Sequence, residues 1–175
     1  LRISIASAGN DHRLGAQEAP PAIVSMFLGE ELNAVLDAIE NDEDYGSKEK
    51  EVLKVGVHVL PRFPKDSTDR NRTSPFAFTG NKFEFRMLGS SLSVSGPNII
   101  LNTAVAEILS QFYEELKNTK PEDMEATVYE LVKRTFIEHK KIIFNGNGYT
   151  DEWVEEAKRR GLPNMKSTPD ALPCF

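Results

Sequence analysis

The sequence has a single cysteine, Cys174, so an internal disulfide is impossible and the chain fits a reducing cytosol. No apolar run approaches the ~18 residues that a membrane span needs, and no signal peptide is visible. The histidines and the cysteine do not have the spacing of a zinc site. A net charge of −6 argues against nucleic acid as a main partner. We therefore expect a cytoplasmic protein with neither a nucleic-acid partner nor a membrane partner.

The length of 175 residues fits one domain, and 27% charged residues are ordinary for a globular chain. The sequence starts at Leu1, without Met, inside an expected strand. It stops soon after Thr168-Pro169-Asp170, which looks like the start of another element. We expect it to be a piece of a larger protein.

Hydrophobic periodicity predicts strands and loops in residues 1–96 and helices in residues 97–175. We expect strands at residues 1–7, 52–60 and 82–88, and helices at residues 30–40, 97–118 and 121–140. Residues 22–28 fit either a strand or a helix. A further helix should begin after its N-cap Thr150, with basic residues in its last turn, and end at Gly161. The helix at 97–118 should bury a stripe of five residues: Val105, Ile108, Leu109, Phe112 and Leu116.

The strand at residues 82–88 carries alternating charges. Lys82, Glu84 and Arg86 should share one face, because strand side chains alternate, while the intervening apolar residues pack on a core. A carboxylate between two cations suits a hard metal ion that also binds anionic substrate oxygens. The alternative is a solvated strand face with ion pairs, which the strand alone would favour.

The loop before this strand, residues 61–81, lacks periodicity and is rich in hydrogen-bond donors. A loop of about 20 residues in a compact domain is usually functional or disordered. Because it contains Phe63, Phe76 and Phe78, we predict an ordered binding loop. Residues 62–86 carry six basic and three acidic side chains, a net charge of +3 on an acidic protein. Such a positive region can concentrate a small anion.

A second polar loop contains Arg13 and Glu18, just before Pro20 and Pro21. Arginine is suited to a bidentate grip on a carboxylate, and a glutamate on a stiff loop can act as a base or a gate. Taken alone, the two residues fit an ordinary surface loop better than a binding site.

Four motifs in this order resemble the C-terminal catalytic half of glutamine synthetase: Arg13-Leu-Gly-Ala-Gln-Glu-Ala-Pro20, Asn71-Arg-Thr-Ser74, Lys82-Phe-Glu-Phe-Arg86 and Gly96-Pro97-Asn98. The longer stretches RLGAQEAPPAIVS, DSTDRNRTSPFAFTGNKFEFRMLGSS and IIFNGNGYTDEWVEEAKRRGLPN resemble the type III branch. The resemblance covers nearly the whole chain, so residues 1–175 would be a partial catalytic domain. It implies an α+β fold with mostly antiparallel strands packed against long helices.

The resemblance also implies an activity, the ATP-dependent ligation of ammonia to L-glutamate through a γ-glutamyl phosphate. ATP would be a co-substrate and Mg²⁺ or Mn²⁺ the metal, with Glu84 as one metal ligand. Arg13 and Arg86 would bind substrate, and Lys82 would stand on the nucleotide side. Arg72 would contact ATP phosphates and stabilise the transferring phosphoryl group, while Glu18 would take a proton from ammonium.

The resemblance places the remaining metal ligands and much of the ATP pocket upstream of these motifs. It also implies sites shared between neighbouring subunits of a homo-oligomer, a dodecamer of stacked rings. We therefore expect residues 1–175 alone to be inactive and the parent protein to be active. Two alternatives stay open: a non-catalytic regulatory homologue that binds glutamate or nucleotide, and an assembly domain that uses the helices at 97–140.

Overall fold

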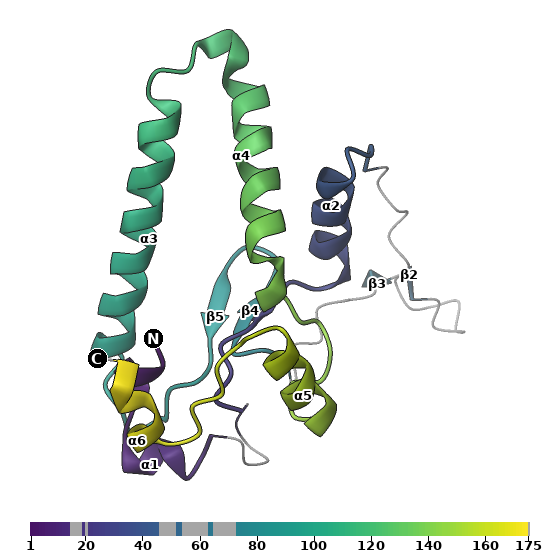
Figure 1. The fold of residues 1–175 in the computed structure, drawn as a ribbon. Coiled ribbons are helices and arrows are strands. Elements are labelled where there is room, and N and C mark those ends of the chain that lie inside the picture. Colours follow the sequence, from purple (N-terminus) through teal and green to yellow (C-terminus); the bar gives the residue numbers. More distant parts are fainter. Residues whose placement is uncertain (15–18, 20, 46–51, 54–62, 65–72, 175) are drawn as a thin grey trace.

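The computed structural model describes residues 1–14, 19, 21–45, 52–53, 63–64 and 73–174 (Figure 1). These residues form an α+β fold, which confirms the expected class. The strands are β1 (Met26–Phe27), β2 (Val52–Leu53), β3 (Phe63–Pro64), β4 (Phe76–Phe78) and β5 (Phe83–Phe85). The α-helices are α1 (Ala8–Asp11), α2 (Glu30–Glu40), α3 (Ser95–Leu116), α4 (Met124–His139), α5 (Asp151–Arg159) and α6 (Thr168–Ala171). The 3₁₀ turns are η1 (Arg2–Ile5), η2 (Pro121–Asp123), η3 (Lys140–Ile142) and η4 (Leu172–Cys174).

The main sheet is small and mixed, in the order β1-β4-β5. β1 and β4 are parallel, with Met26 opposite Phe76, whereas β4 and β5 are antiparallel. The expectation of mostly antiparallel strands is therefore wrong for this sheet. The long connection that contains α2 brings the chain back in the same direction, as a parallel pair requires. β2 and β3 form a separate antiparallel pair.

Two local predictions in the first half of the chain are also wrong. Residues 2–5 form the 3₁₀ turn η1 instead of a strand. Residues 76–78, expected within a loop, form the central strand β4. Of the strand expected at 52–60, only residues 52 and 53 lie in the described part, and both are in β2.

Tertiary contacts explain why η1 is not a strand. Ile5 is 1% exposed and packs with Ala22 and Met87, while the buried Arg2 donates to the carbonyl of Met165 at 2.8 Å. These contacts hold Arg2 against the C-terminal segment and Ile5 in the core, and residues 2–5 do not pair with the β1-β4-β5 sheet. Here the environment of the segment overrides the alternating pattern of Ile3 and Ile5.

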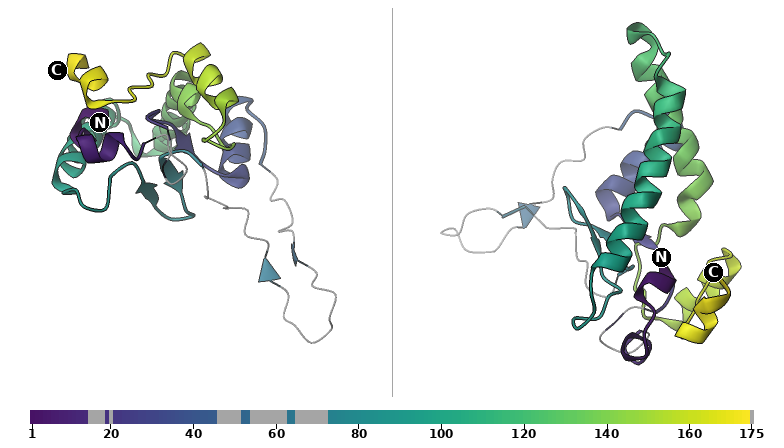
Figure 2. Two further views of the ribbon diagram at one scale, coloured as in Figure 1. Left: turned by 90° about the horizontal axis from the view of Figure 1, so that it is seen from below. Right: turned by 90° about the vertical axis from the view of Figure 1, so that its left-hand side faces the viewer.

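The base of the molecule joins the two ends of the chain, and Figure 2 shows the termini close together there. Asp11 accepts from Arg2 Nη2 at 2.8 Å and from the backbone N–H of Thr168 at 2.7 Å. Burial would raise the pKa of the Asp11 carboxyl, but the Thr168 N–H and the Arg2 guanidinium together lower it below its ordinary value. Residues almost 160 positions apart are thus linked through one carboxylate.

The long helices lie close to their predicted positions. α2 has the predicted bounds, α3 is shifted by two residues, and α4 follows the short turn η2. Thr150 caps α5, since its hydroxyl accepts from the N–H of Trp153 at 3.2 Å. The helix ends before Gly161, whose φ of +71° favours glycine.

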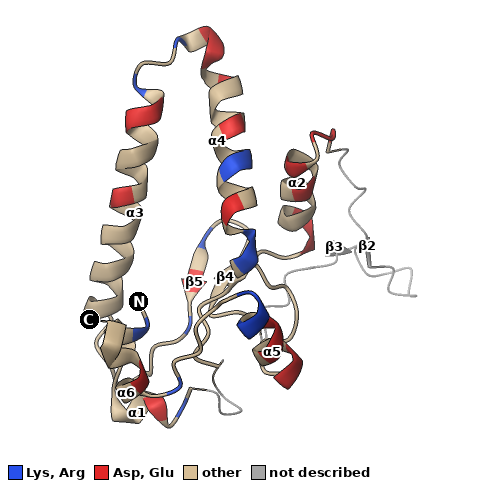
Figure 3. Cartoon of the chain, in the orientation of Figure 1, with Lys and Arg blue, Asp and Glu red and all other residues tan. Residues whose placement is uncertain are grey.

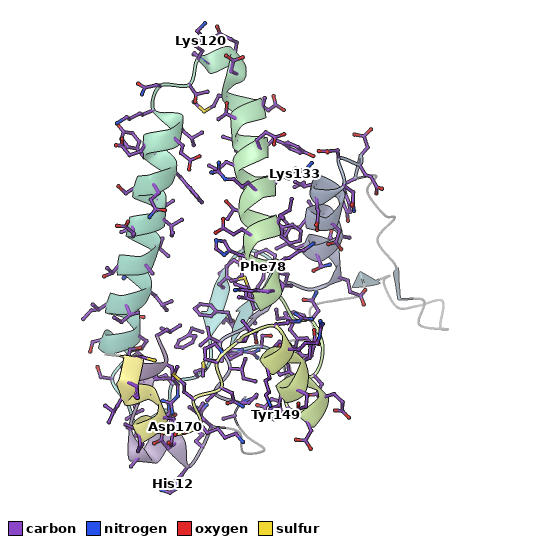
Figure 4. All side chains as sticks on the ribbon, in the orientation of Figure 1. His12, Phe78, Lys120, Lys133, Tyr149 and Asp170 are labelled. Atoms are coloured by element: carbon purple, nitrogen blue, oxygen red, sulfur yellow. The ribbon has the colours of Figure 1, made fainter. Side chains whose placement is uncertain are left out.

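α3 and α4 form an antiparallel hairpin with Lys120 near its tip (Figures 1 and 4). An ion pair between Arg134 and Glu115 at 2.6 Å connects the two helices. On its other side α4 faces α2 (Figure 1), and Lys133 of α4 pairs with Asp42, which follows α2. Among the described residues, no helix is both long and apolar enough to cross a membrane.

The predicted buried stripe of α3 is largely exposed in this chain. Val105 is 56%, Ile108 44% and Leu109 59% exposed, while Phe112 and Leu116 are half-buried. The core lies below the hairpin instead, in two clusters of buried residues. One consists of Ile23, Trp153, Ala157 and Leu162, and the other of Ile5, Ala22 and Met87.

Candidate active site

The β4–β5 hairpin positions the charged strand that the sequence singled out. Glu84 is opposite Ala77, and cross-strand partners lie on the same face of a sheet. The turn is closed by the Thr79 N–H, which donates to the carbonyl of Lys82 at 2.9 Å, and Gly80 takes a φ of +89° there. The opposite face has two aromatic pairs with ring centroids 4.9 and 5.2 Å apart: Phe76–Phe85 and Phe78–Phe83.

The aromatic face is only partly packed on a core. Phe85 contacts the cluster of Ile5, Ala22 and Met87, as predicted, whereas Phe83 is 48% exposed. The hairpin therefore has a charged face and an aromatic face, as predicted. On the aromatic face, Phe85 packs on the core, whereas Phe83, nearer the β4–β5 turn, is largely exposed.

Lys82 and Glu84 lie close together on the charged face. Their Nζ and Oε1 atoms are 3.8 Å apart, and their side chains are 65% and 28% exposed. An ion pair this open to water contributes little to stability, about 0–1 kcal/mol. The β5 ribbon shows the two signs of charge next to each other (Figure 3). The Glu84 side chain is thus partly exposed to solvent.

Arg86 is anchored to the segment that enters β4. Its Nη2 donates to Thr73 Oγ1 at 2.6 Å and to the carbonyl of Ser74 at 2.9 Å. Its backbone N–H donates to the carbonyl of Pro75 at 2.8 Å. Thr73, Ser74 and Pro75 are buried, so the Arg86 guanidinium is fixed against an ordered backbone.

Arg13 reaches the same end of β5 from the first polar loop. Its Nη1 donates to the carbonyl of Met87 at 3.3 Å and to Asn10 Oδ1 at 3.4 Å. The Asn10 amide, 1% exposed, in turn donates to the carbonyls of Met87 and Ile5. Arg13 is therefore attached to the residue that follows Arg86, although the two arginines are more than 70 residues apart in sequence.

Two of the predicted site residues, Glu18 and Arg72, lie outside the described residues. The Gly96-Pro97 motif opens α3, where a Cβ at Gly96 would lie 3.0 Å from the carbonyl oxygen of Ser4. Glycine at position 96 thus allows the start of α3 to approach η1 closely, so this motif contributes packing at the edge of the site.

The charged face of the hairpin offers a divalent metal one carboxylate ligand, Glu84. Mg²⁺ is typically bound by one or two carboxylates together with waters and substrate phosphates. The partly exposed Glu84 carboxylate fits one such ligand. The described part of the chain contains no group of three or more His, Cys, Asp or Glu side chains that could hold a metal by itself.

Sequence reasoning missed the residues that support the arginines, notably Asn10, Thr73 and Ser74. It also missed that residues near Phe144 reach the site, since the Phe144 carbonyl accepts from Ser74 Oγ at 3.0 Å. A local signal for β4 was present: Phe-Ala-Phe, a Thr-Gly-Asn turn and Phe-Glu-Phe form a hairpin pattern.

Comparison with known proteins shows the family of the chain. The family model for the glutamine synthetase C-terminal domain matches residues 127–175. The chain is 53% identical over 173 residues to the type-3 glutamine synthetase of Dictyostelium discoideum, covering 98% of this chain. It is 49% identical to a glutamine synthetase of Butyrivibrio fibrisolvens and 46% identical to one of Bacteroides fragilis (strain YCH46), covering 99% and 98% of this chain.

The chain spans 24% of the length of each of these three relatives. The matched stretches cover 98–99% of this chain and therefore extend over both of its halves. The chain belongs to the glutamine synthetase family, in the branch whose Dictyostelium member is named type 3.

Proposed function

We propose that the protein containing this chain ligates ammonia to L-glutamate at the expense of ATP, through a γ-glutamyl phosphate intermediate. The observation that carries the proposal is the grouping at β5. Glu84 lies beside Lys82, and Arg86 and Arg13 are both held at the end of the same strand. Phosphoryl transfer depends mainly on positioning and on neutralising negative charge, and this grouping supplies both.

Each residue has a distinct role in this proposal. Arg13 binds the carboxylate of glutamate, and Arg86 holds substrate carboxylate or phosphoryl oxygens. Glu84 is a ligand of a divalent metal, Mg²⁺ or Mn²⁺, which would neutralise phosphate charge when bound. Lys82, whose side chain is 65% exposed, neutralises charge on the nucleotide side.

Glu18 and Arg72 complete the proposed chemistry. Arg72 contacts the ATP phosphates and stabilises the transferring phosphoryl group. Glu18 closes over the intermediate and takes a proton from ammonium, so that ammonia can attack the γ-carbonyl carbon of the acyl phosphate and displace phosphate. Excluding water at this step prevents hydrolysis of the intermediate.

The proposed site needs more than residues 1–175. One carboxylate among the described residues does not complete a metal site, so this segment alone should not catalyse the reaction. We propose that the working enzyme is a cytoplasmic homo-oligomer, a dodecamer of stacked rings with sites between subunits. Its partners would be glutamate, ammonium and ATP, without nucleic acid or membrane.

The test uses the full-length protein. We would measure phosphate release that depends on ATP, glutamate and ammonium in the presence of Mg²⁺, for the wild type and for Glu84→Ala and Glu18→Ala. We expect each variant to lose at least about 100-fold in kcat/KM, because a metal ligand and a general base each contribute on this scale.

A matched control is Glu125→Ala, which removes an exposed glutamate on α4, far along the hairpin from β5. It should retain wild-type activity. An inactive wild type that still binds glutamate or ATP would favour the regulatory homologue instead. An active Glu84→Ala variant would refute the assignment of the metal ligand.

A further inference from the structure

A chain of buried hydrogen bonds leads away from Arg86 into the second half of the protein. Ser25 Oγ donates to Ser74 Oγ at 2.9 Å, and Ser74 Oγ donates to the carbonyl of Phe144 at 3.0 Å. Ser25 and Ser74 are each 1% exposed. A serine hydroxyl has one proton to donate, and both protons are used in the same direction, toward Phe144.

The three groups come from segments far apart in sequence. Ser25 precedes β1, Ser74 precedes β4, and Phe144 follows η3. A buried hydroxyl without a partner destabilises the folded state, whereas a fully satisfied buried network stabilises one arrangement of its members. This network therefore determines where the backbone at Ser74 lies relative to β1 and Phe144.

The far end of the network is itself firmly held. The Phe144 N–H donates to the carbonyl of Met26 at 2.8 Å, and its ring stacks on Trp153 with centroids 3.8 Å apart. The next residue, Asn145, accepts from the N–H groups of Leu28 and Gly29 at 2.9 and 3.1 Å. The Phe144 carbonyl is thus a fixed acceptor for the Ser74 hydroxyl.

The near end of the network is the guanidinium of Arg86. The carbonyl of Ser74 accepts from Arg86 Nη2 at 2.9 Å, and Thr73 Oγ1 accepts from the same nitrogen at 2.6 Å. Moving the backbone at Ser74 would move two acceptors of the Arg86 side chain together. A shift of about 1 Å in a positioning group can reduce a rate by about 100-fold.

The geometry points to a positioning brace for Arg86, formed by Ser25, Ser74 and the Phe144 carbonyl. None of the three touches substrate in this scheme. They act through Arg86, by fixing the backbone that orients its guanidinium. The inference rests on the proposed function of Arg86. It also gives Phe144 a part in the site, although Phe144 lies far from Arg86 in sequence.

The test compares Ser74→Ala with Ser25→Ala in the full-length enzyme, by steady-state kinetics with glutamate varied. Ser74→Ala removes both hydroxyl bonds and should lower kcat/KM for glutamate about 10-fold, with less than about twofold change in KM for ATP. Ser25→Ala leaves the Ser74–Phe144 bond in place and should have a smaller effect. Ser25→Thr, which keeps the hydroxyl, should recover most of the loss.

A double-mutant cycle separates positioning from simple loss of stability. If Ser74 acts through Arg86, the double variant Ser74→Ala/Arg86→Lys should have a kcat/KM less than about twofold below that of Arg86→Lys alone. Leu131→Ala is the stability control, because Leu131 is 7% exposed on α4 and lies outside the brace. It should lower the melting temperature and leave kcat/KM unchanged.

The outcomes distinguish the two proposals. A wild-type enzyme that forms glutamine while Ser74→Ala retains full kcat/KM would overturn the brace and leave the proposed function standing. Additive effects of Ser74→Ala and Arg86→Lys would also overturn it. A full-length wild type unable to form glutamine would overturn both.

Discussion

Helices α5 and α3 use their apolar residues in opposite ways. α5 is short and rich in charge, yet its Trp153 and Ala157 are 2% and 1% exposed. α3 is more than twice as long and has no charged residue from Ser95 to Ala106, yet Ile99 is 64% exposed. In Figure 3 this half of α3 is uniformly tan, whereas α5 has acidic and basic ends. Burial in this chain follows from the presence of a packing surface and not from the hydrophobicity of the helix.

The difference in burial between α5 and α3 follows from what each helix packs against. α5 packs Trp153 against Ile23 and Phe144, and Arg160 lies 5.4 Å above the Trp153 ring. The guanidinium of Arg160 also donates to the carbonyl of Ile143 at 2.8 Å. In α3, by contrast, the side chains expected to be buried are mostly exposed to solvent. Substitutions in the two helices should therefore differ in their effects on stability.

The largest expected effect is that of Trp153→Ala in α5. Removing a fully buried aromatic side chain should lower the free energy of unfolding by about 3–5 kcal/mol. The matched substitution on α3 is Tyr113→Ala, because Tyr113 is 64% exposed. It should change the free energy of unfolding by less than about 0.5 kcal/mol. Chemical denaturation of the two variants measures both values, and equal losses would contradict the contrast between the helices.

Asn145→Ala tests the turn that leads into α5. It leaves the N–H groups of Leu28 and Gly29 without their acceptor, which should lower the free energy of unfolding by about 1–3 kcal/mol. Asn145→Asp keeps an acceptor oxygen and should lose less. The exposed Asn102 of α3 provides the control, since Asn102→Ala should be nearly neutral in the same denaturation experiment.

Thr150→Ala tests the N-cap of α5. The variant loses the hydroxyl that accepts from the Trp153 N–H, and stability should fall by about 1 kcal/mol. Thr150→Ser retains a capping hydroxyl and should lie close to the wild type. A Thr150→Ala variant with wild-type stability would mean that the packing of Trp153 alone defines the start of the helix.

The smallest expected effect concerns the charged surface of α5. Hydrogen bonds from Arg159 and then Arg160 lower the pKa of Glu156 from 4.5 to about 2. Because the folded-state pKa is depressed, the stabilisation is fully present above pH 4.5 and is lost as the pH falls toward 2. The melting temperature of Glu156→Gln should be below that of the wild type at neutral pH.

This difference between Glu156→Gln and the wild type should shrink between pH 4.5 and 2. Melting curves recorded across that window measure it. A difference that stays constant with pH would show that the two arginines do not favour the charged form of Glu156. High salt should also reduce the difference, because the side chain is partly exposed and its ion pairs are screened.

Local sequence signals predicted the charged strand and several helices. The alternation of Lys82, Glu84 and Arg86 predicted the charged face of β5, and the cap at Thr150 predicted the start of α5. The roles assigned to the six site residues remain predictions, and two of them, Glu18 and Arg72, lie outside the described residues. Ser74 and Asn10 were not predicted as supports, because the acceptors of their hydrogen bonds, the carbonyls of Phe144 and Met87, lie about 70 and 77 residues away in sequence.

The sequence by itself determined the features that depend on neighbouring residues: strand alternation, helix periodicity, helix capping and turns. The tertiary structure decided the parallel pairing of β1 with β4, the 3₁₀ turn at residues 2–5 and the exposure of α3. It also decided the hydrogen bond from Arg13 to the carbonyl of Met87, the residue next to Arg86. These features depend on contacts between distant segments, and a local pattern specifies which side chains share a face without specifying what that face meets.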